Sequence, residues 1–376
     1  MIHKYIKYFY PDIGSEDPIV SCIEQLLDFL SLKQLTLRNI LFLNIFFKYD
    51  NEFDTKIKYI EKQLLKYNLD VPTAKIPQNP ENFNYVFEVW FITGDFNTVN
   101  FGDNFKIILR NNLFILYASI FNCKLYDENY FNNTFQELQK ILDKNRFPIN
   151  SIFRQWAFIG NILELNDGIQ NYQKYNNLRA ELYSKTQWKK GYPCATAIGI
   201  KSDALNISII AKRGHLNYDE YNLLNPLQIK PFKYNNKILI SSNPNNKPPL
   251  FERGKIICTE DNISFYISGT SSIRGQTTIG NNDIILQTKI TIENIKTLLN
   301  PFEIQKKIKP NYFEKIKKIN LMKSFSYLRI YLQDLKNINL IKPFILEEFD
   351  SVPTIYLEAD ICRQDLSIEI EGAIFI

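Results

Sequence analysis

The alternation of apolar and acidic side chains at the end of the chain constrains the fold most tightly. Residues Ser367–Phe375 follow the two-residue period of a β-strand, with Ile368 and Ile370 on one face and Glu369 and Glu371 on the other. Side chains two positions apart on a strand point to the same side and lie about 7 Å apart. The strand therefore has one apolar face and one face that carries two carboxylates.

The two carboxylates admit two interpretations. A pair of carboxylates on a β-surface is a candidate acid/base device, in which one group protonates a reacting atom. The same pattern arises where two ordinary glutamates lie on a solvated strand face, because Glu is usually exposed. The pattern alone favours the solvated face, so a catalytic role needs support from elsewhere in the chain.

Length and composition indicate a large globular chain. Its 376 residues are 45% hydrophobic and 14% aromatic, which suffices for one large domain or two ordinary ones with sizeable cores. The net charge is only +5, and the most basic stretch, Ile304–Lys318, is typical of a solvated helix or loop face. We therefore expect no nucleic-acid partner.

The distribution of reactive side chains argues against several kinds of site. With two histidines in the chain, histidine triads and histidine-rich metal sites are not expected. The five cysteines are scattered without a CxxC pair, which argues against a zinc site or a disulfide framework and suits a reducing cytoplasm. The N-terminus lacks a signal-peptide pattern, and the apolar runs Ile40–Phe47 and Leu113–Phe121 are far short of the roughly 20 residues that span a bilayer. We expect a cytoplasmic protein with no metal and no membrane partner.

Hydrophobic periodicity predicts helices and strands along most of the chain. The expected helices are 16–48, 56–67, 133–145, 153–163, 171–184, 288–299 and 335–349. The expected strands are 84–93, 98–101, 105–109, 113–120, 193–200, 205–211, 255–259, 263–268, 327–332, 352–360 and 367–375. From Gly254 onward the order is ββ-α-β-α-β-β. Residues 225–249 have many Pro and Asn and no periodicity, which is typical of a long functional or mobile loop.

Short motifs in the second half of the chain form a recognisable set. They are Asn171–Arg179, Gly191–Gly199, Asn225–Gln228, Phe251–Gly254, Phe265–Ile273, Leu328–Tyr331, Glu358–Arg363 and Ile368–Glu371. In this order and spacing they resemble the chorismatase family, whose last domain is similar to a YjgF-like (reactive-intermediate deaminase) fold. The resemblance covers residues 150–376 well and residues 84–122 more weakly.

We expect an α+β fold in two parts. Residues 1–150 are expected to form a mixed αβ domain, a degenerate copy that covers the pocket. The resemblance implies that residues 151–376 form a chorismatase-like catalytic region, with a YjgF-like sheet and two helices on one face at about 254–376. Whether the protein is a monomer or a trimer stays open.

The resemblance implies a chorismate-cleaving hydrolase or lyase that needs no cofactor. Chorismatases hydrolyse the enolpyruvyl ether of chorismate to pyruvate and a dihydroxycyclohexadiene or a hydroxybenzoate. A vinyl ether hydrolyses when an acid protonates its terminal methylene and water adds to the oxocarbenium ion, and a carboxylic acid in an apolar site can supply that proton. Glu369 matches the family's catalytic glutamate and is expected to be the acid. Glu371 is either a partner that raises the pKa of Glu369 or a structural residue.

Cys362 is the position that the resemblance links to the product. Members of the family with Cys there, and with Gly at the position of Gly275, resemble those that form an aromatic product, which favours 3-hydroxybenzoate. A Cys362 thiolate would be a nucleophile for a ring intermediate. The alternative is a small buried cysteine at a strand end. Arg363 follows it and has a structural ion pair as its alternative role.

Chorismate is a dianion, so its pocket needs cationic anchors. Arginine binds carboxylates through two parallel hydrogen bonds. Arg179, Arg253 and Arg329 each lie in a matched motif and are candidate anchors, with a structural ion pair as the alternative for each. Tyr192 and Gln228 are candidate hydroxyl and amide donors.

The chain departs from the family pattern at two positions near the expected pocket. Gln276 replaces a usual histidine, and Ala197 replaces a usual glycine. Two alternatives therefore remain beside chorismate cleavage. One is a diverged enzyme that acts on another enolpyruvyl or enamine acid, and the other is a non-catalytic protein that binds an aromatic acid.

Overall fold

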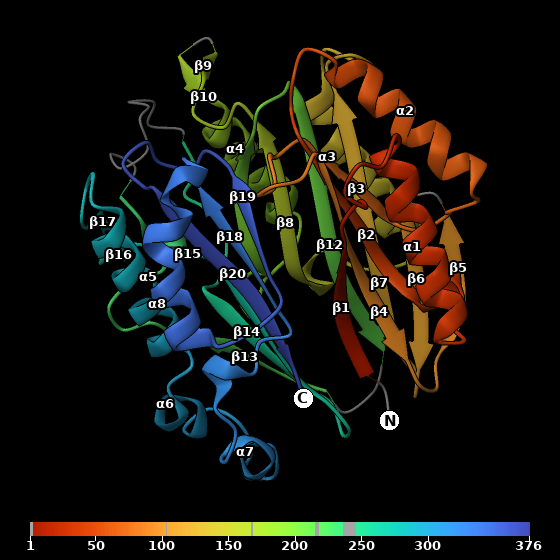
Figure 1. The fold of residues 1–376 in the computed structure, drawn as a ribbon. Coiled ribbons are helices and arrows are strands. Elements are labelled where there is room, and N and C mark those ends of the chain that lie inside the picture. The colour runs from red at the N-terminus through yellow and green to blue at the C-terminus, as the bar shows by residue number, and fades with distance from the viewer. Residues whose placement is uncertain (1–2, 103, 167, 215–217, 236–245) are drawn as a thin grey trace.

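The computed structural model describes residues 3–102, 104–166, 168–214, 218–235 and 246–376 (Figure 1). Its strands form three principal sheets, which belong to three consecutive units of the chain. We call them the N-terminal unit (3–93), the middle unit (97–214) and the C-terminal unit (219–375). The α+β class predicted from the sequence is confirmed.

The N-terminal unit has a four-stranded sheet of order β1-β4-β2-β3 and two helices. Its elements are β1 (His3–Phe9), α1 (Pro18–Leu32), β2 (Ile40–Phe47), α2 (Phe53–Lys66), β3 (Thr73–Ile76) and β4 (Tyr85–Thr93). Helix α1 begins at Asp17, whose carboxylate accepts a hydrogen bond from the Val20 amide at 3.2 Å, a standard N-cap. The helix ends at Leu32 and the chain forms β2 at Ile40–Phe47, so the prediction of one helix over 16–48 is wrong beyond Leu32.

The middle unit has a six-stranded sheet of order β5-β6-β7-β12-β8-β11. Its elements are β5 (Asn97–Gly102), β6 (Phe105–Arg110), β7 (Leu113–Cys123), α3 (Tyr130–Lys144), β8 (Ile152–Gly160), the short β9 (Leu165–Asn166) and β10 (Ile169–Gln170), α4 (Asn171–Ser184), β11 (Cys194–Ile200) and β12 (Ala204–Gly214). The helix predicted over 153–163 is wrong, because this segment is strand β8. This sheet takes strands from both sides of residue 150, and the division of the chain there remains a proposal.

The C-terminal unit has a six-stranded sheet of order β13-β14-β15-β20-β18-β19. Its elements are β13 (Asp219–Leu223), β14 (Gly254–Cys258), β15 (Ile263–Ser271), β16 (Ile273–Arg274), β17 (Thr277–Thr278), α5 (Ile284–Leu298), α6 (Pro301–Gln305), α7 (Pro310–Ile316), β18 (Tyr327–Leu332), α8 (Ile338–Phe349), β19 (Thr354–Glu358) and β20 (Ile368–Phe375). The main strands and helices follow the predicted order ββ-α-β-α-β-β.

The three units repeat one topology. In each, a strand, a helix, a strand, a helix and two strands follow one another, as β1-α1-β2-α2-β3-β4 do in the first unit. The second and third strands pair in parallel, and the fourth lies between the first and the second. The chain is therefore built from three copies of one fold, two of which carry two extra strands at one edge.

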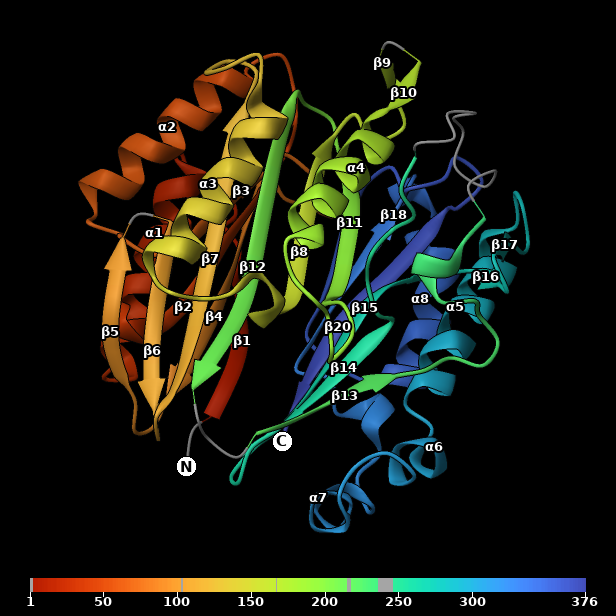
Figure 2. The same ribbon diagram turned by 180° about the vertical axis from the view of Figure 1, so that it is seen from behind.

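The sheets lie inside and the helices outside (Figures 1 and 2). One apolar cluster, with Trp90, Trp156 and Tyr331 among its buried members, draws residues from all three units. Three further clusters fill the space between each sheet and its own helices. The strands are thus covered on both faces, which explains why several of them lack a two-residue period.

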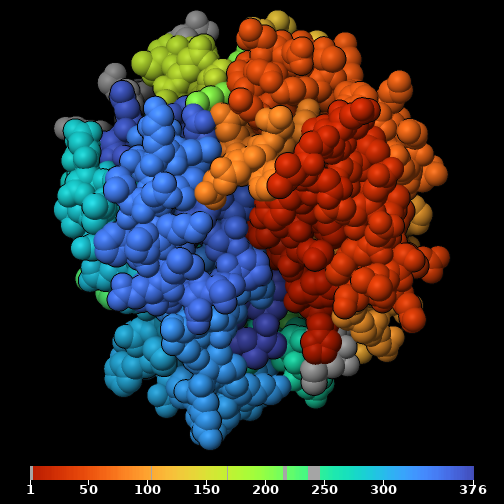
Figure 3. All heavy atoms as spheres, in the orientation of Figure 1, coloured from red at the N-terminus to blue at the C-terminus, as the bar shows by residue number. Residues whose placement is uncertain are grey.

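The units meet edge to face around the central cluster. Strand β11 of the middle unit lies beside β15 of the C-terminal unit, and the Glu252 amide donates to the Pro193 carbonyl at 2.9 Å. In Figure 3 the red and orange N-terminal unit lies against the blue C-terminal unit. The two are joined by the Glu81 amide, which donates to the Tyr356 carbonyl at 3.0 Å. Among the described helices, none is long and apolar enough to cross a membrane.

Candidate active site

Glu369 lies on β20, in the middle of the C-terminal sheet, at the boundary with the middle unit. It pairs with Ser271 of β15, whose hydroxyl donates a hydrogen bond to Glu369 Oε2 at 3.0 Å. Its side chain is 5% exposed. A methyl group on Gly269 would lie 2.7 Å from the Glu369 carboxyl carbon, closer than real contacts allow, so the carboxyl group occupies space that only glycine leaves open.

A cavity opens over the Glu369 carboxyl group. Its empty volume is about 580 Å³, including open solvent at its mouth. The middle unit supplies one wall through α4 and β11, and the C-terminal unit supplies the rest. The lining residues are Tyr172, Arg179, Ala195, Ala197, Tyr234, Pro249, Phe251, Arg253, Gly269, Ser271, Ile273, Cys362, Arg363 and Glu369.

Arginines make this cavity cationic. Arg179 is held by a hydrogen bond from its Nη2 to Asn176 Oδ1 at 2.6 Å, and Arg253 donates to the Tyr234 hydroxyl. Both are almost fully buried, and in the described part of the chain the Nε atoms of both have no hydrogen-bond partner. Arg363 is the third cation of the wall. Buried N–H groups without a partner are costly, so these two guanidinium groups are suited to receive an anion.

Arg363 also holds the loop that follows β16. Its Nη1 donates to the Gln276 carbonyl at 2.8 Å, and its guanidinium group lies 5.4 Å from the centre of the Tyr234 ring. The Gln276 side chain, which replaces a usual histidine, accepts a hydrogen bond from the Asn235 amide at 3.2 Å. Gln276 therefore supports the loop without lining the cavity, whereas Ala197, the other departure, is part of the wall.

Burial makes Glu369 a carboxylic acid at neutral pH. The pKa of Glu369 is raised to about 8, chiefly by desolvation and to a lesser extent by the nearby charge of Glu371. The Ser271 hydrogen bond and the charges of Arg253 and Arg154 lower it only in part. The group is therefore protonated near neutral pH and can act as a general acid.

Cys362 lines the same cavity, but it is not a ready nucleophile. The pKa of the Cys362 thiol is raised to about 12, mainly by burial and also by the charge of Glu369. Since the thiolate is the nucleophilic form, a standing thiolate at this position is disfavoured. Of the two interpretations of Cys362, the raised pKa favours the protonated, buried cysteine, and its role stays a prediction.

Glu371 lies outside the cavity, in a buried ion cluster at the junction of the three units. It pairs with Arg154 and with Arg329, whose Nη1 lies 3.0 Å from Glu371 Oε1. Arg329 Nε also donates to Glu88 Oε2 at 2.8 Å, which links in the N-terminal unit. Burial raises the pKa of Glu371, but Arg154 and Arg329 outweigh it and hold that pKa below its usual value.

Two buried arginines and two buried glutamates therefore balance each other. Additional donors to Glu371 are the Trp156 indole at 2.9 Å and the Tyr331 hydroxyl at 2.7 Å. A buried ion pair of this kind holds its geometry only while both partners are present. Of the two roles considered for Glu371, this geometry supports a structural one, with a minor effect on the pKa of Glu369.

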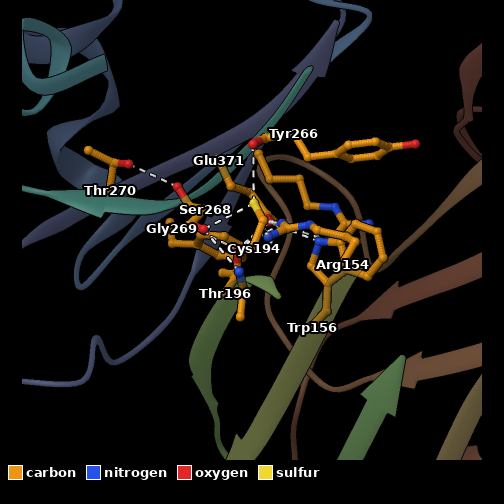
Figure 4. A network of polar contacts seen from close by, with 12 residues as sticks. Arg154, Trp156, Cys194, Thr196, Tyr266, Ser268, Gly269, Thr270 and Glu371 are labelled. Atoms are coloured by element: carbon orange, nitrogen blue, oxygen red, sulfur yellow. Dashed lines mark hydrogen bonds and ion pairs between the residues drawn. The ribbon is translucent and has the colours of Figure 1, made fainter. Parts of the chain in front are cut away.

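Thr196 connects the ion cluster to the cavity (Figure 4). Its hydroxyl donates to Glu371 and accepts hydrogen bonds from Arg154 Nη2 and from the Gly269 amide, both at 2.9 Å. Gly269 is the residue that leaves room for Glu369. The cluster thus fixes the backbone against which the acid lies.

Four residues predicted to bind substrate lie outside the cavity wall. Arg329 belongs to the ion cluster. Tyr192 lies in a neighbouring aromatic group, with its ring 5.3 Å from that of Phe232. Gln228 donates to the Ile273 carbonyl at 3.1 Å, and Gly275, with φ of +60°, exchanges backbone hydrogen bonds with residues 227 and 229.

Other side chains of the cavity and of the ion cluster were not predicted from the sequence. Tyr172, Tyr234 and Phe251 line the cavity, and Tyr234 belongs to a loop without periodicity. Arg154 lies in the segment 153–163, which was predicted to be a helix but forms β8. Its charge within an otherwise apolar run was the one feature of the sequence that could have indicated a buried ion pair. No described residue before Tyr172 lines the cavity, so residues 1–150 contribute through the ion cluster, by Glu88.

Comparisons with known proteins agree with the sequence motifs. Residues 88–211 match the family described as chorismatase FkbO/Hyg5-like, N-terminal. A 3-hydroxybenzoate synthase of Streptomyces hygroscopicus is 24% identical over 237 residues, which are 61% of this chain and 64% of that protein. A chorismatase of Streptomyces rapamycinicus is 24% identical over 229 residues, 60% of this chain and 64% of that protein. The chain thus matches somewhat less than two thirds of the length of these relatives.

The fold is that of a chorismatase. A crystal structure of a chorismatase at 1.08 Å resolution superimposes with a TM-score of 0.68 and 16% identity, covering 99% of this chain and 98% of that one. At this identity the match shows the fold alone. Together with the family model and the two relatives, it confirms the resemblance inferred from the motifs.

Proposed function

We propose that the chain is a chorismatase-like enzyme that cleaves the enolpyruvyl ether of chorismate into pyruvate and a hydroxybenzoate, with 3-hydroxybenzoate favoured. One observation carries the proposal: Glu369, a carboxyl group that is protonated near neutral pH, lies in a cavity whose wall holds Arg179, Arg253 and Arg363. The names of the two curated relatives, a 3-hydroxybenzoate synthase and a chorismatase, point to the same chemistry.

The arginines would anchor the substrate. Chorismate carries two carboxylates, and the cavity offers two buried guanidinium groups, on Arg179 and Arg253, whose Nε donors lack partners among the described residues. Arg253 comes from the C-terminal unit, on the same side as Glu369, and Arg179 from the middle unit. Because both units belong to one chain, the proposed activity needs no second copy, whether the protein is a monomer or a trimer.

Glu369 would start the reaction. Its proton goes to the terminal methylene of the enolpyruvyl group, which leaves an oxocarbenium ion and a carboxylate. Water adds to that ion, its proton returns to Glu369, and the hemiketal collapses to pyruvate and a ring diol. Loss of the C4 hydroxyl as water then gives 3-hydroxybenzoate, so the water used in the first step is returned in the second.

Cys362 would influence the second step through its position. Its thiol is protonated, so it contributes shape and a weak hydrogen-bond donor beside the ring. Ala197, where the family usually has glycine, adds a methyl group to the opposite wall. This methyl group is the observation that keeps a second candidate open, another enolpyruvyl or enamine acid of slightly different shape.

The proposal is tested by incubating the purified protein with chorismate, following pyruvate, and identifying the ring product by mass and retention time. Pyruvate with 3-hydroxybenzoate is the expected result. Pyruvate with 4-hydroxybenzoate or with the diol keeps the role of Glu369 and removes the product assignment. If the folded protein releases no pyruvate, chorismate cleavage is excluded, and another substrate or a binding function is favoured.

Matched variants separate an enzyme from a binding protein. Glu369→Gln removes the acid but keeps the size of the side chain, and it should abolish turnover while ligand binding survives. Glu358→Gln, on β19 of the same sheet, is the control, because its carboxylate lies outside the cavity, where it pairs with Lys201 and accepts a hydrogen bond from Asn79 at 2.7 Å. A protein that only binds would show no difference between the two variants.

A further inference from the structure

A second cavity lies at the end of the molecule where the three sheets converge. Every unit supplies part of its wall. The N-terminal unit contributes β1 and β4, the middle unit β6, β7 and β12, and the C-terminal unit β14, β15 and β20. Figures 1 and 2 show β1, β14 and the end of β20 approaching one another at this end of the molecule. Its empty volume is about 1420 Å³, including open solvent, and it shares no lining residue with the cavity over Glu369.

The floor of this cavity is apolar. Ile92, Ile108, Phe153 and Ile257 are buried there, and Phe375 is half-buried. Apolar surface of this kind gains about 25 cal/mol for each Å² that a ligand removes from water. The floor would accommodate an aliphatic or aromatic body without any polar partner.

Lys4 stands out beside this floor. Among the residues that the structure describes, its ammonium group makes no ion pair and no hydrogen bond, and it lies 5.8 Å from the centre of the Phe375 ring. The pKa of Lys4 is lowered to about 8, mainly by burial and also by repulsion from Arg110. Lys4 is half-buried, so its ammonium group is only partly hydrated, and the carboxylate of a ligand in the cavity would give it a charged partner.

The other charged groups of the wall are placed differently. Arg110 pairs with Asp261, and Lys212 Nζ lies 2.8 Å from Glu220 Oε2. Asp261 and its neighbour Glu260 are exposed on the turn between β14 and β15, at the rim of the cavity. Lys4 therefore presents positive charge next to an apolar surface, while the negative charges of the wall, on Glu260 and Asp261, face water.

We propose that this cavity binds an amphipathic monocarboxylate, with the carboxylate at Lys4 and the apolar body on the isoleucine and phenylalanine floor. The carboxylate and the apolar body are both needed. A simple anion would leave the apolar floor in contact with water, and a neutral apolar molecule would leave Lys4 without an ion pair. The ligand class is thus a medium-chain or aromatic carboxylic acid. The inference does not depend on the reaction at Glu369.

The test uses a dye and a matched pair of small ligands. The dye 1-anilinonaphthalene-8-sulfonate, an anion on an aromatic body, reports occupancy by fluorescence, and octanoate and octan-1-ol compete for it. Octanoate should displace the dye at a concentration at least about tenfold lower than octan-1-ol, which corresponds to one charge-assisted hydrogen bond. No saturable binding, or equal displacement by acid and alcohol, would overturn the proposal.

Variants locate the site. Lys4→Met should remove the preference for octanoate, while Lys4→Arg should keep it. Lys7→Met is the control, because Lys7 is exposed on the other face of β1, and its loss should leave the preference unchanged. Glu369→Gln should also bind the dye as the parent protein does. If Lys4→Met binds octanoate as tightly as the parent protein does, the assignment of Lys4 is contradicted. Unfolding curves show that each variant is folded.

Discussion

Replacing Gly269 by alanine tests how the active site is positioned. The backbone of Gly269 is outside the left-handed region, so alanine adds no backbone strain there. The new methyl group would lie 2.7 Å from the Glu369 carboxyl carbon and 3.0 Å from Thr196 Cγ2. The only way to accommodate it is to move the carboxyl group or the strand that carries it.

The expected magnitude follows from these distances. Ordinary contact begins at 3.4 Å, so the Glu369 carboxyl carbon must move by at least about 0.7 Å, and Glu369 Oε1, which lies nearer to the new methyl group, must move further. A misplacement near 1 Å can lower a catalytic rate by about 100-fold. Overpacking a buried site costs about 1–3 kcal/mol of stability. We therefore expect Gly269→Ala to fold, to lose most of its turnover of chorismate, and to unfold at lower urea concentration.

The assay combines kinetics with a double-mutant cycle. Pyruvate release gives kcat, and urea unfolding gives stability for Gly269→Ala, Glu369→Ala and the double variant. Most of the stability loss should vanish in the Glu369→Ala background, because only the contact with Thr196 remains. The reasoning is refuted if Gly269→Ala keeps kcat within threefold, or if its stability loss is the same in both backgrounds. The cycle tests the geometry even if chorismate is not the substrate.

Further predictions concern pH, charge and product. With the acid form of Glu369 required, kcat/KM for chorismate should be level below pH 7 and fall tenfold per unit above about pH 8, whereas a rise with pH would contradict a general acid. Because folding raises the pKa of Glu369 from 4.5 to about 8, the parent protein should lose about 1.4 kcal/mol of stability per pH unit across that window relative to Glu369→Gln, as urea titrations can show. Arg154→Met leaves Glu371 with one ion pair fewer and should cost about 3–5 kcal/mol in urea unfolding; a loss below about 1 kcal/mol would remove the ion cluster from the account. Arg253→Lys should raise KM about tenfold with little change in kcat, because lysine cannot bind a carboxylate through two parallel hydrogen bonds. Cys362→Ala should shift the ring product from 3-hydroxybenzoate toward the diol, measured by chromatography, and an unchanged product ratio would remove Cys362 from product control.

Much of the C-terminal unit could be predicted from the sequence, because its strands and helices carry clear periods. Ser367–Phe375 alternates, and in the helix found at Ile284–Leu298 the buried Ile292, Ile295 and Leu298 recur at helical spacing. Ile40–Phe47 and Ile152–Gly160 could not be recognised as strands in this way. Both are covered by helices on one face and by the central cluster on the other, so every residue is buried and the two-residue period disappears.

The threefold repeat of the topology was also beyond the sequence analysis. It consists of the order and direction of strands, and no repeated motif along the chain accompanies it. Residues 1–150 were expected to hold one degenerate copy, whereas sheets of two units begin within them. The cytoplasmic location, the absence of a cofactor and the absence of a nucleic-acid partner remain predictions.

For the site, the sequence motifs identified several residues that line one cavity. Glu369 and Cys362 lie seven positions apart and line one cavity, with Arg253 and Arg179 placed there by their own motifs. The ion cluster was missed because Arg154 and Glu371 are 217 positions apart, and nothing in a single sequence pairs residues at that distance. Arg329 lies in a matched motif, but its guanidinium group is consumed by two buried carboxylates.

The most direct test of the central claim is pyruvate release from chorismate by the parent protein and by Glu369→Gln at pH 7. The account predicts turnover by the parent and a loss of at least about 100-fold in the variant, with ligand binding retained. Equal rates in the two proteins would contradict the assignment of Glu369 as the acid.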